Sequence, residues 1–168
     1  MIIRASEYIQ KNYPGIRHFA TLSPIPRFRD YLTSVLAGAA RNFSLTGQKI
    51  DTNKRGRFIS DGELRDIKEE FSKKEKGVET LSISVMLRKV LGDEQWQANS
   101  VLRRAMEHPM AELTRYYLTR EKRIDRKTSA RTTCAYDPVA NFHLSNGASI
   151  GSINYLANPS ERGMRESY

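Results

Sequence analysis

Two side chains of this sequence, Ser23 and His143, could carry out proton-transfer chemistry together. Ser23 precedes Pro24, and a proline ring disfavours the α conformation of the residue before it, so the serine hydroxyl is expected on extended backbone. His143 can change its charge near neutral pH and can exchange a proton with a hydroxyl group that it meets. Such a pair could orient a substrate and deliver a proton to it.

Both residues also have ordinary structural explanations, and the residue pattern leaves these open. A serine before proline is commonly a turn or cap residue, and a histidine can simply be a hydrogen-bonded strand residue. The other histidines are weaker candidates, because His18 lies in an apolar segment and His108 precedes a proline near a helix end. We interpret Cys134 as a small buried residue, since no cation-rich niche around its thiol can be identified.

The first 42 residues are expected to form a helix, a strand and a second helix that together position Ser23. An apolar stripe at helical spacing from Ile2 to Tyr13 predicts the first helix, which Pro14-Gly15 ends. Residues 16–22 predict a short strand leading to Ser23. A second apolar stripe from Phe28 onwards predicts the next helix.

Residues 43–130 are expected to be mainly helical. A polar loop or insertion is predicted over 42–56, and Ser60 and Glu63 have the spacing of a capping box that starts a helix running to about Gly77. Further helices are predicted over 80–91, after Asp93 and from Pro109. The region ends in a basic tract, 120–131, to which the pattern assigns no structure.

A hairpin that carries His143 is expected in the last part of the chain, 131–168. Alternating segments 139–144 and 148–155 flank Asn146-Gly147, a dipeptide that favours a two-residue hairpin turn. In that register His143 would lie on a polar, exposed face beside Asn141 and Ser152, with the apolar Phe142 on the opposite face.

Composition limits the classes of protein that need to be considered. The 168 residues are 39% hydrophobic and 28% charged, with a net charge of +9, and no apolar run approaches the ~20 residues that span a bilayer. One cysteine and the lack of CxxC or HxxxH spacing favour a reducing compartment without a structural zinc site. Residues 1–14 mix charges into an amphipathic pattern, unlike a signal peptide. The positive charge favours an anionic partner.

Three functional classes fit these observations. A nucleic-acid-binding module would use the basic tract, but the sequence has neither a zinc finger nor RNP-type aromatic strands. A non-catalytic interaction domain is compatible with the helical middle region and with Tyr116-Tyr117, which could lie in an interface or a core. The third class is an enzyme acting on an anionic, phosphorylated thioester.

Two segments resemble the malonyl-CoA decarboxylase family and favour the third class. Residues 21–26 (TLSPIP), followed by Phe28, look like the serine motif of that family, and residues 137–148 (DPVANFHLSNGA) look like its histidine motif. Weaker similarity covers 153–157 together with Ser160 and Arg162-Gly163. The resemblance implies conversion of malonyl-CoA to acetyl-CoA and CO2, with Ser23 and His143 catalytic, with Ser23, His143 and Asn141 contacting the substrate, and without a metal or cofactor.

The resemblance also implies a fold class. We expect an α+β chain forming part of a GNAT-like (acetyltransferase-like) domain, with a helical insertion and a C-terminal β-hairpin. A CoA-binding strand and loop are expected before residue 1 and a further strand after residue 168, so the isolated chain is expected to have little activity. We also expect a cytoplasmic or organelle-matrix location and no membrane or nucleic-acid partner. A homo-oligomer is possible by the same resemblance.

Overall fold

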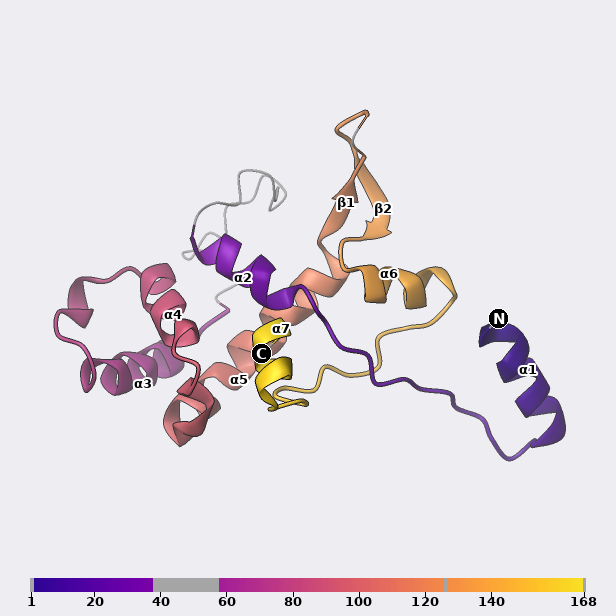
Figure 1. Cartoon of the computed structure of the whole chain (residues 1–168), viewed down its shortest axis with the longest axis horizontal. Coiled ribbons are helices and arrows are strands. Elements are labelled where there is room, and N and C mark those ends of the chain that lie inside the picture. Colours follow the sequence, from indigo (N-terminus) through magenta and orange to yellow (C-terminus); the bar gives the residue numbers. More distant parts are fainter. Residues whose placement is uncertain (1, 38–57, 126, 168) are drawn as a thin grey trace.

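The computed structural model describes residues 2–37, 58–125 and 127–167, a mixture of helices with one small sheet (Figure 1). The polar loop predicted over 42–56 lies outside these residues. The elements in chain order are α1 (Ile2–Asn12), α2 (Phe28–Leu36), α3 (Asp61–Ser72), the 3-10 helix η1 (Val78–Thr80), α4 (Ile83–Gly92), the 3-10 helix η2 (Trp96–Ala98), α5 (Ser100–Thr119), β1 (Lys122–Ile124), β2 (Arg131–Ala135), α6 (Pro138–Ser145) and α7 (Glu161–Glu166).

The core is built around α5. Its buried side chains recur every three or four residues from Leu102 to Leu118, which gives the helix a continuous apolar stripe. Helix α3 packs along α5, η2 packs at its start, and α2 contacts both α4 and α7. Trp96, Met86 and Ile67 are at most 1% exposed, so the helical middle region supplies most of the apolar burial.

Helix α5 runs through Pro109, and the prediction of a new helix starting there is wrong. Proline costs an interior helix one hydrogen bond and about 3 kcal/mol of intrinsic stability. Pro109 is fully buried, however, between apolar residues of the same stripe on both sides. Packing of both halves of α5 against the core therefore outweighs the local preference for a break.

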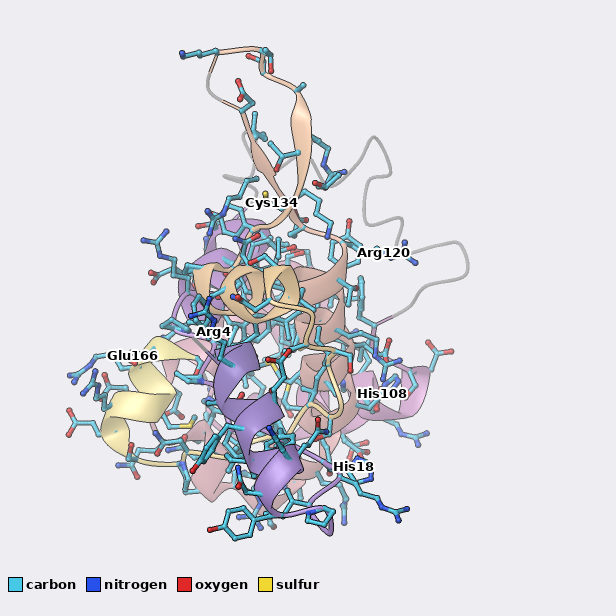
Figure 2. The ribbon with its side chains drawn as sticks, turned by 90° about the vertical axis from the view of Figure 1, so that its right-hand side faces the viewer. Arg4, His18, His108, Arg120, Cys134 and Glu166 are labelled. Atoms are coloured by element: carbon cyan, nitrogen blue, oxygen red, sulfur yellow. The ribbon has the colours of Figure 1, made fainter. Side chains whose placement is uncertain are left out.

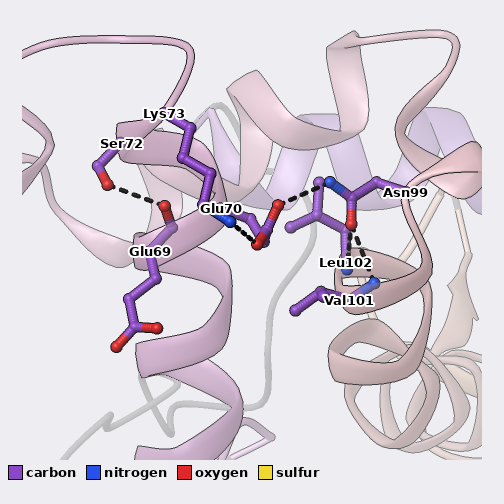
Figure 3. A network of polar contacts seen from close by, with 7 residues as sticks. All are labelled: Glu69, Glu70, Ser72, Lys73, Asn99, Val101 and Leu102. Carbon is purple, nitrogen blue, oxygen red and sulfur yellow. Dashed lines mark hydrogen bonds and ion pairs between the residues drawn. The ribbon is translucent and has the colours of Figure 1, made fainter.

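Polar contacts cap the start of α3 and, separately, join its last turn to the start of α5 (Figure 3). The predicted capping box is confirmed, because Glu63 N donates to Ser60 Oγ and Ser60 N donates to a Glu63 carboxylate oxygen. At α5, Asn99 Oδ1 accepts from the first-turn amides while its amide donates to Glu70 Oε2 over 2.8 Å. The hydrogen bond from Lys73, with that from Asn99, lowers the pKa of Glu70.

The sheet lies in the basic tract rather than at the C-terminal end. Strands β1 and β2 pair antiparallel, with Lys122 opposite Ala135 and Ile124 opposite Arg131, and project from the helical body (Figure 1). Asp125 Oδ1 accepts from the amides of residues 127 and 128, each over 2.8 Å, which builds the turn. The sequence pattern assigned no structure to this tract, so the hairpin was not predicted.

Residues 139–155 do not form the predicted hairpin. Residues 138–145 form α6 instead, with Asp137 as its N-cap and Pro138 in its first turn. Asn146-Gly147 is the end of this helix: Ala148 N donates to the His143 carbonyl and Gly147 N to the Leu144 carbonyl, each over 3.1 Å. That pair of bonds is a Schellman motif, and Gly147 takes the left-handed conformation it requires (φ 83°).

Residues 13–27 form an extended arm that connects α1 with α2. The helix predicted from Ile2 to Tyr13 is confirmed as α1, which lies apart from the helical body (Figure 1). The strand predicted over 16–22 is wrong, because this segment pairs with no strand of the described chain. An apolar composition alone cannot form a strand without a neighbouring edge. Leu22 is consequently 91% exposed.

The predicted α+β class is confirmed, because the described residues combine helices with a two-stranded antiparallel sheet. The acetyltransferase-like arrangement stays a prediction, since the sheet in the described residues has only two strands. None of the described helices is both long enough and apolar enough to cross a bilayer.

Candidate active site

Ser23 and His143 lie within hydrogen-bonding distance of each other. Ser23 Oγ is 3.0 Å from His143 Nε2, although 120 residues separate the two in sequence. Thr21 Oγ1 lies 3.2 Å from Ser23 Oγ, so two hydroxyls and one imidazole form a continuous row. Such a row can pass a proton, because each hydroxyl both donates and accepts and the ring does either according to its tautomer.

The extended arm presents the two hydroxyls. Side chains two residues apart on extended backbone point to the same side, which brings Thr21 next to Ser23. Pro24 restricts the backbone of Ser23, and Ile25 and Pro26 are partly buried where the arm meets the body. Phe28 follows at 1% exposure and fixes the end of the arm in the core. Ser23 itself remains exposed.

His143 projects from the last turn of α6, and its predicted position on an exposed strand face is wrong. The side chain is partly buried, with its ring edge-on to Phe142 at a centroid distance of 5.2 Å. Both ends of this eight-residue helix are capped, by Asp137 and by the Schellman motif. The caps matter because an isolated helix of this length is unstable in water.

The neighbours predicted for His143 are not beside it as a hairpin would place them. Asn141 lies two positions earlier on the helix, and residues spaced by two do not face each other there. Ser152 lies in the loop after α6, where its hydroxyl is 3.4 Å from Asn154 Oδ1. Contact of Asn141 with a substrate therefore stays a prediction without its hairpin argument.

Two buried hydrogen bonds join a tyrosine to a carboxylate near the elements that carry the pair. Tyr117 OH donates to Asp137 Oδ2 over 3.3 Å, and Tyr31 OH donates to Glu121 Oε1 over 3.1 Å. Burial is the main cause that raises the pKa of Tyr117, and the negative charge of Asp137 adds to it. Burial is likewise the main cause that raises the pKa of Tyr31, with Glu121 adding to it. Burial also raises the pKa of Glu121. Both tyrosines are thus neutral hydrogen-bond donors at physiological pH.

A surface hollow of about 340 Å³ opens close to the arm. It is lined by Arg27, Asp30, Tyr31, Ser34 and Tyr136. Its lining includes Arg27, four residues after Ser23, and Tyr136, which is adjacent to Asp137. A second hollow of about 400 Å³ lies along α5 and includes Arg103 and Arg104.

The other chemically active residues do not join the site. His108 Nδ1 is 3.3 Å from Glu63 Oε1, and His18 is exposed on the arm. Both lie away from α6 in Figure 2. The interpretation of Cys134 as buried is wrong, because the residue is exposed on β2. The described residues hold no cluster of three side chains suited to bind a metal ion.

Comparison with known proteins identifies the family. The family model described as the malonyl-CoA decarboxylase C-terminal domain matches residues 1–168, and thus the whole chain. The chain belongs to this family. It is 29% identical over 167 residues to the mitochondrial malonyl-CoA decarboxylases of Anser anser anser, Rattus norvegicus and Mus musculus.

The match to these malonyl-CoA decarboxylases covers 99% of this chain but only 28% to 29% of their lengths. No solved structure matches the chain. The family resemblance inferred from the serine and histidine motifs is therefore confirmed, and both motif residues lie inside the matched region.

Three residues of this malonyl-CoA decarboxylase family member belong to the site and were not predicted. Thr21 contacts Ser23, Asp137 caps the helix of His143, and Tyr117 binds Asp137. Two of them carried a sequence signal. Spacing by two on extended backbone points to Thr21, and Asp-Pro is a helix-start signature. Tyr117 carried none, because its partner lies on a different helix.

Proposed function

We propose that this chain contributes to a malonyl-CoA decarboxylase that converts malonyl-CoA to acetyl-CoA and CO2. Family membership supports the substrate class, and the hydroxyl–imidazole contact supports the chemistry. The single observation that carries the proposal is the 3.0 Å distance from Ser23 Oγ to His143 Nε2, which joins the two motif residues from separate elements.

The reaction requires charge stabilisation and one proton. Breaking the bond between the α-carbon and the carboxylate releases CO2 and leaves its electron pair on the thioester as an enolate. The site must stabilise the enolate oxygen and then protonate the α-carbon, which gives the acetyl thioester. Since the thioester carbonyl accepts the electrons, no metal or organic cofactor is required.

We assign the orienting role to Ser23 and the acid–base role to His143. The serine hydroxyl can donate to the malonyl group while the imidazole holds it in place and supplies or relays the proton. Thr21 steadies the hydroxyl from the other side. Asn141 remains a candidate substrate contact. Substrate phosphates would be attracted by the net charge of +9.

The proposal also covers the fold of the domain, its location in the cell and its oligomeric state. A GNAT-like catalytic domain, a reducing organelle matrix and a possible homo-oligomer are expected, the matrix because the named relatives are mitochondrial. Residues 1–168 alone are expected to turn over malonyl-CoA poorly. Ser23 lies on an exposed arm, and a displacement of ~1 Å at a reacting group can cost on the order of 10²-fold in rate.

The test uses the chain extended at both ends with the flanking segments of a relative. Mass spectrometry of the products from ¹³C-labelled malonyl-CoA should detect acetyl-CoA and CO2. Ser23→Ala and His143→Asn should each lower kcat roughly 10²-fold or more, as expected for loss of a proton-transfer partner.

Matched controls separate the pair from other serines and histidines. Ser152→Ala and His18→Asn change the same residue types outside the site and should leave kcat within about twofold. Near-normal turnover in Ser23→Ala or His143→Asn would remove that residue from the mechanism. A nucleic-acid complex that survives physiological salt would instead favour a binding module.

A further inference from the structure

Placement of the His143 ring depends on α6, and α6 is fixed at its start by a buried carboxylate. Asp137 is only 1% exposed, yet all of its oxygens have partners. Oδ1 accepts from Val139 N and Ala140 N at 2.9 and 2.8 Å, and Oδ2 accepts from Tyr117 OH at 3.3 Å. One carboxylate thus ties the first turn of α6 to the middle of the core.

Tyr117 also connects to the segment that carries Ser23. The ring is fully buried, and its centroid lies 5.6 Å from that of Phe28 and 4.6 Å from that of Tyr31. Phe28 begins α2 directly after the arm. The same aromatic side chain therefore packs against the anchor of Ser23 and hydrogen-bonds to the anchor of His143.

We propose that Tyr117 and Asp137 form a buried positioning pair that sets the separation of Ser23 and His143. Neither residue touches the two reacting side chains, so their effect passes through α6 and through α2. The catalytic consequence rests on the proposed function, whereas the geometric consequence does not depend on it.

A second tyrosine–carboxylate pair provides a matched control. Tyr31 is 3% exposed and donates to Glu121, which is 2% exposed, over 3.1 Å. Glu121 lies at the base of the β1–β2 hairpin, and its other oxygen is 3.9 Å from Arg131 Nη2. Tyr31→Phe and Tyr117→Phe thus each delete one buried hydroxyl bonded to a carboxylate, but only Tyr117 binds the cap of α6.

The first readout is ¹⁵N NMR of the histidine rings in residues 1–168. The chain has three histidines, and His143→Asn identifies the signal of interest. Ser23→Ala defines the Nε2 shift of a ring without its serine partner. Tyr117→Phe and Asp137→Asn should move the Nε2 signal towards that value, whereas Tyr31→Phe should leave it in place.

Thermal unfolding is recorded for the same variants, since each deletion removes a buried hydrogen bond and is expected to lower Tm. An unchanged His143 signal in folded Tyr117→Phe, or an equal displacement in Tyr31→Phe, would overturn the positioning role. Asp137→Asn serves as the second variant because it keeps an oxygen for the α6 amides and loses only the charged acceptor of Tyr117.

The second readout is activity in the extended chain. Tyr117→Phe should lower kcat about tenfold with little change in KM relative to the unsubstituted extended chain, because misplacement of ~1 Å affects chemistry more than binding. An unchanged kcat in Tyr117→Phe would also overturn the inference. Absence of decarboxylation in the unsubstituted extended chain would defeat the proposed function alone, and the NMR result would still decide the positioning role.

Discussion

Gly163 is a position where adding one methyl group should destabilise the protein in spite of helix propensity. A Cβ atom built on this residue of α7 would lie 2.2 Å from the Asn158 carbonyl oxygen and 2.6 Å from Asn158 Cγ. Backbone is the nearer obstacle, so a rotamer change cannot relieve the contact. Gly163 N also donates to Ser160 Oγ over 3.1 Å, which fixes the start of α7 against that loop.

The magnitude follows from two opposing effects. Overpacking of this kind costs about 1–3 kcal/mol, and alanine in place of glycine in a helix returns at most about 1 kcal/mol. Gly163→Ala should therefore lose ~1–2 kcal/mol of unfolding free energy, which for a chain of this size lowers Tm by roughly 2–8 °C. Urea unfolding and differential scanning calorimetry measure both quantities.

Gly62 provides the control with the opposite sign. It lies in the first turn of α3, where an added Cβ would be 4.0 Å from the nearest atom, Ser60 Oγ. Gly62→Ala should raise unfolding free energy by up to about 1 kcal/mol, since only the propensity term acts. If Gly163→Ala were as stable as Gly62→Ala, the close packing of α7 on residue 158 would be refuted.

Three further predictions concern the core, the buried charge and the hydroxyl row. Met86→Ala should cost about 2–5 kcal/mol by calorimetry, whereas Leu22→Ala should stay within about 0.5 kcal/mol, because the first side chain is fully buried and the second is 91% exposed. Burial raises the pKa of Glu121, so its contribution to stability is fully present below the ordinary glutamate pKa and is lost as pH rises through the folded-state pKa. In urea unfolding, Glu121→Gln should therefore gain stability relative to the unsubstituted chain as the pH rises above the ordinary glutamate pKa. Thr21→Val removes one neutral hydrogen bond to Ser23 and should lower kcat of the extended chain roughly 2- to 10-fold, and an unchanged kcat would exclude Thr21 from the site.

The helices of the middle region were predictable because their signals are local. Apolar spacing identified α2, α3 and α4, and the Ser60–Glu63 box fixed the start of α3 to the residue. Pro109 was misjudged because propensity describes an isolated helix, whereas buried packing on both sides decides this one. The β1–β2 hairpin was missed because its pairing depends on turn chemistry at Asp125 inside a charged tract.

The proximity of Ser23 and His143 was predictable, but the backbone geometry around them was not. Ser23 and His143 were identified from their motifs, and their hydrogen bond agrees with the prediction that they act together. The backbone around each was wrong, since the strand before Ser23 is an unpaired arm and the hairpin of His143 is a helix. Asn-Gly supplied the false signal, because a glycine with positive φ ends a helix as readily as it turns a hairpin.

The signals at the two ends of α6 explain how so short a helix can hold the His143 ring in place. An N-cap Asp followed by Pro starts it, and Asn-Gly stops it after eight residues, so its length is encoded locally. The local sequence does not determine where α6 lies, because its position depends on the hydrogen bond from Tyr117 to Asp137 and on the packing of Tyr117 against Phe28. The residues that stabilise the fold are therefore different from the residues of the candidate site. The helical core provides the support, while Ser23 lies on the exposed arm and His143 on the short helix α6.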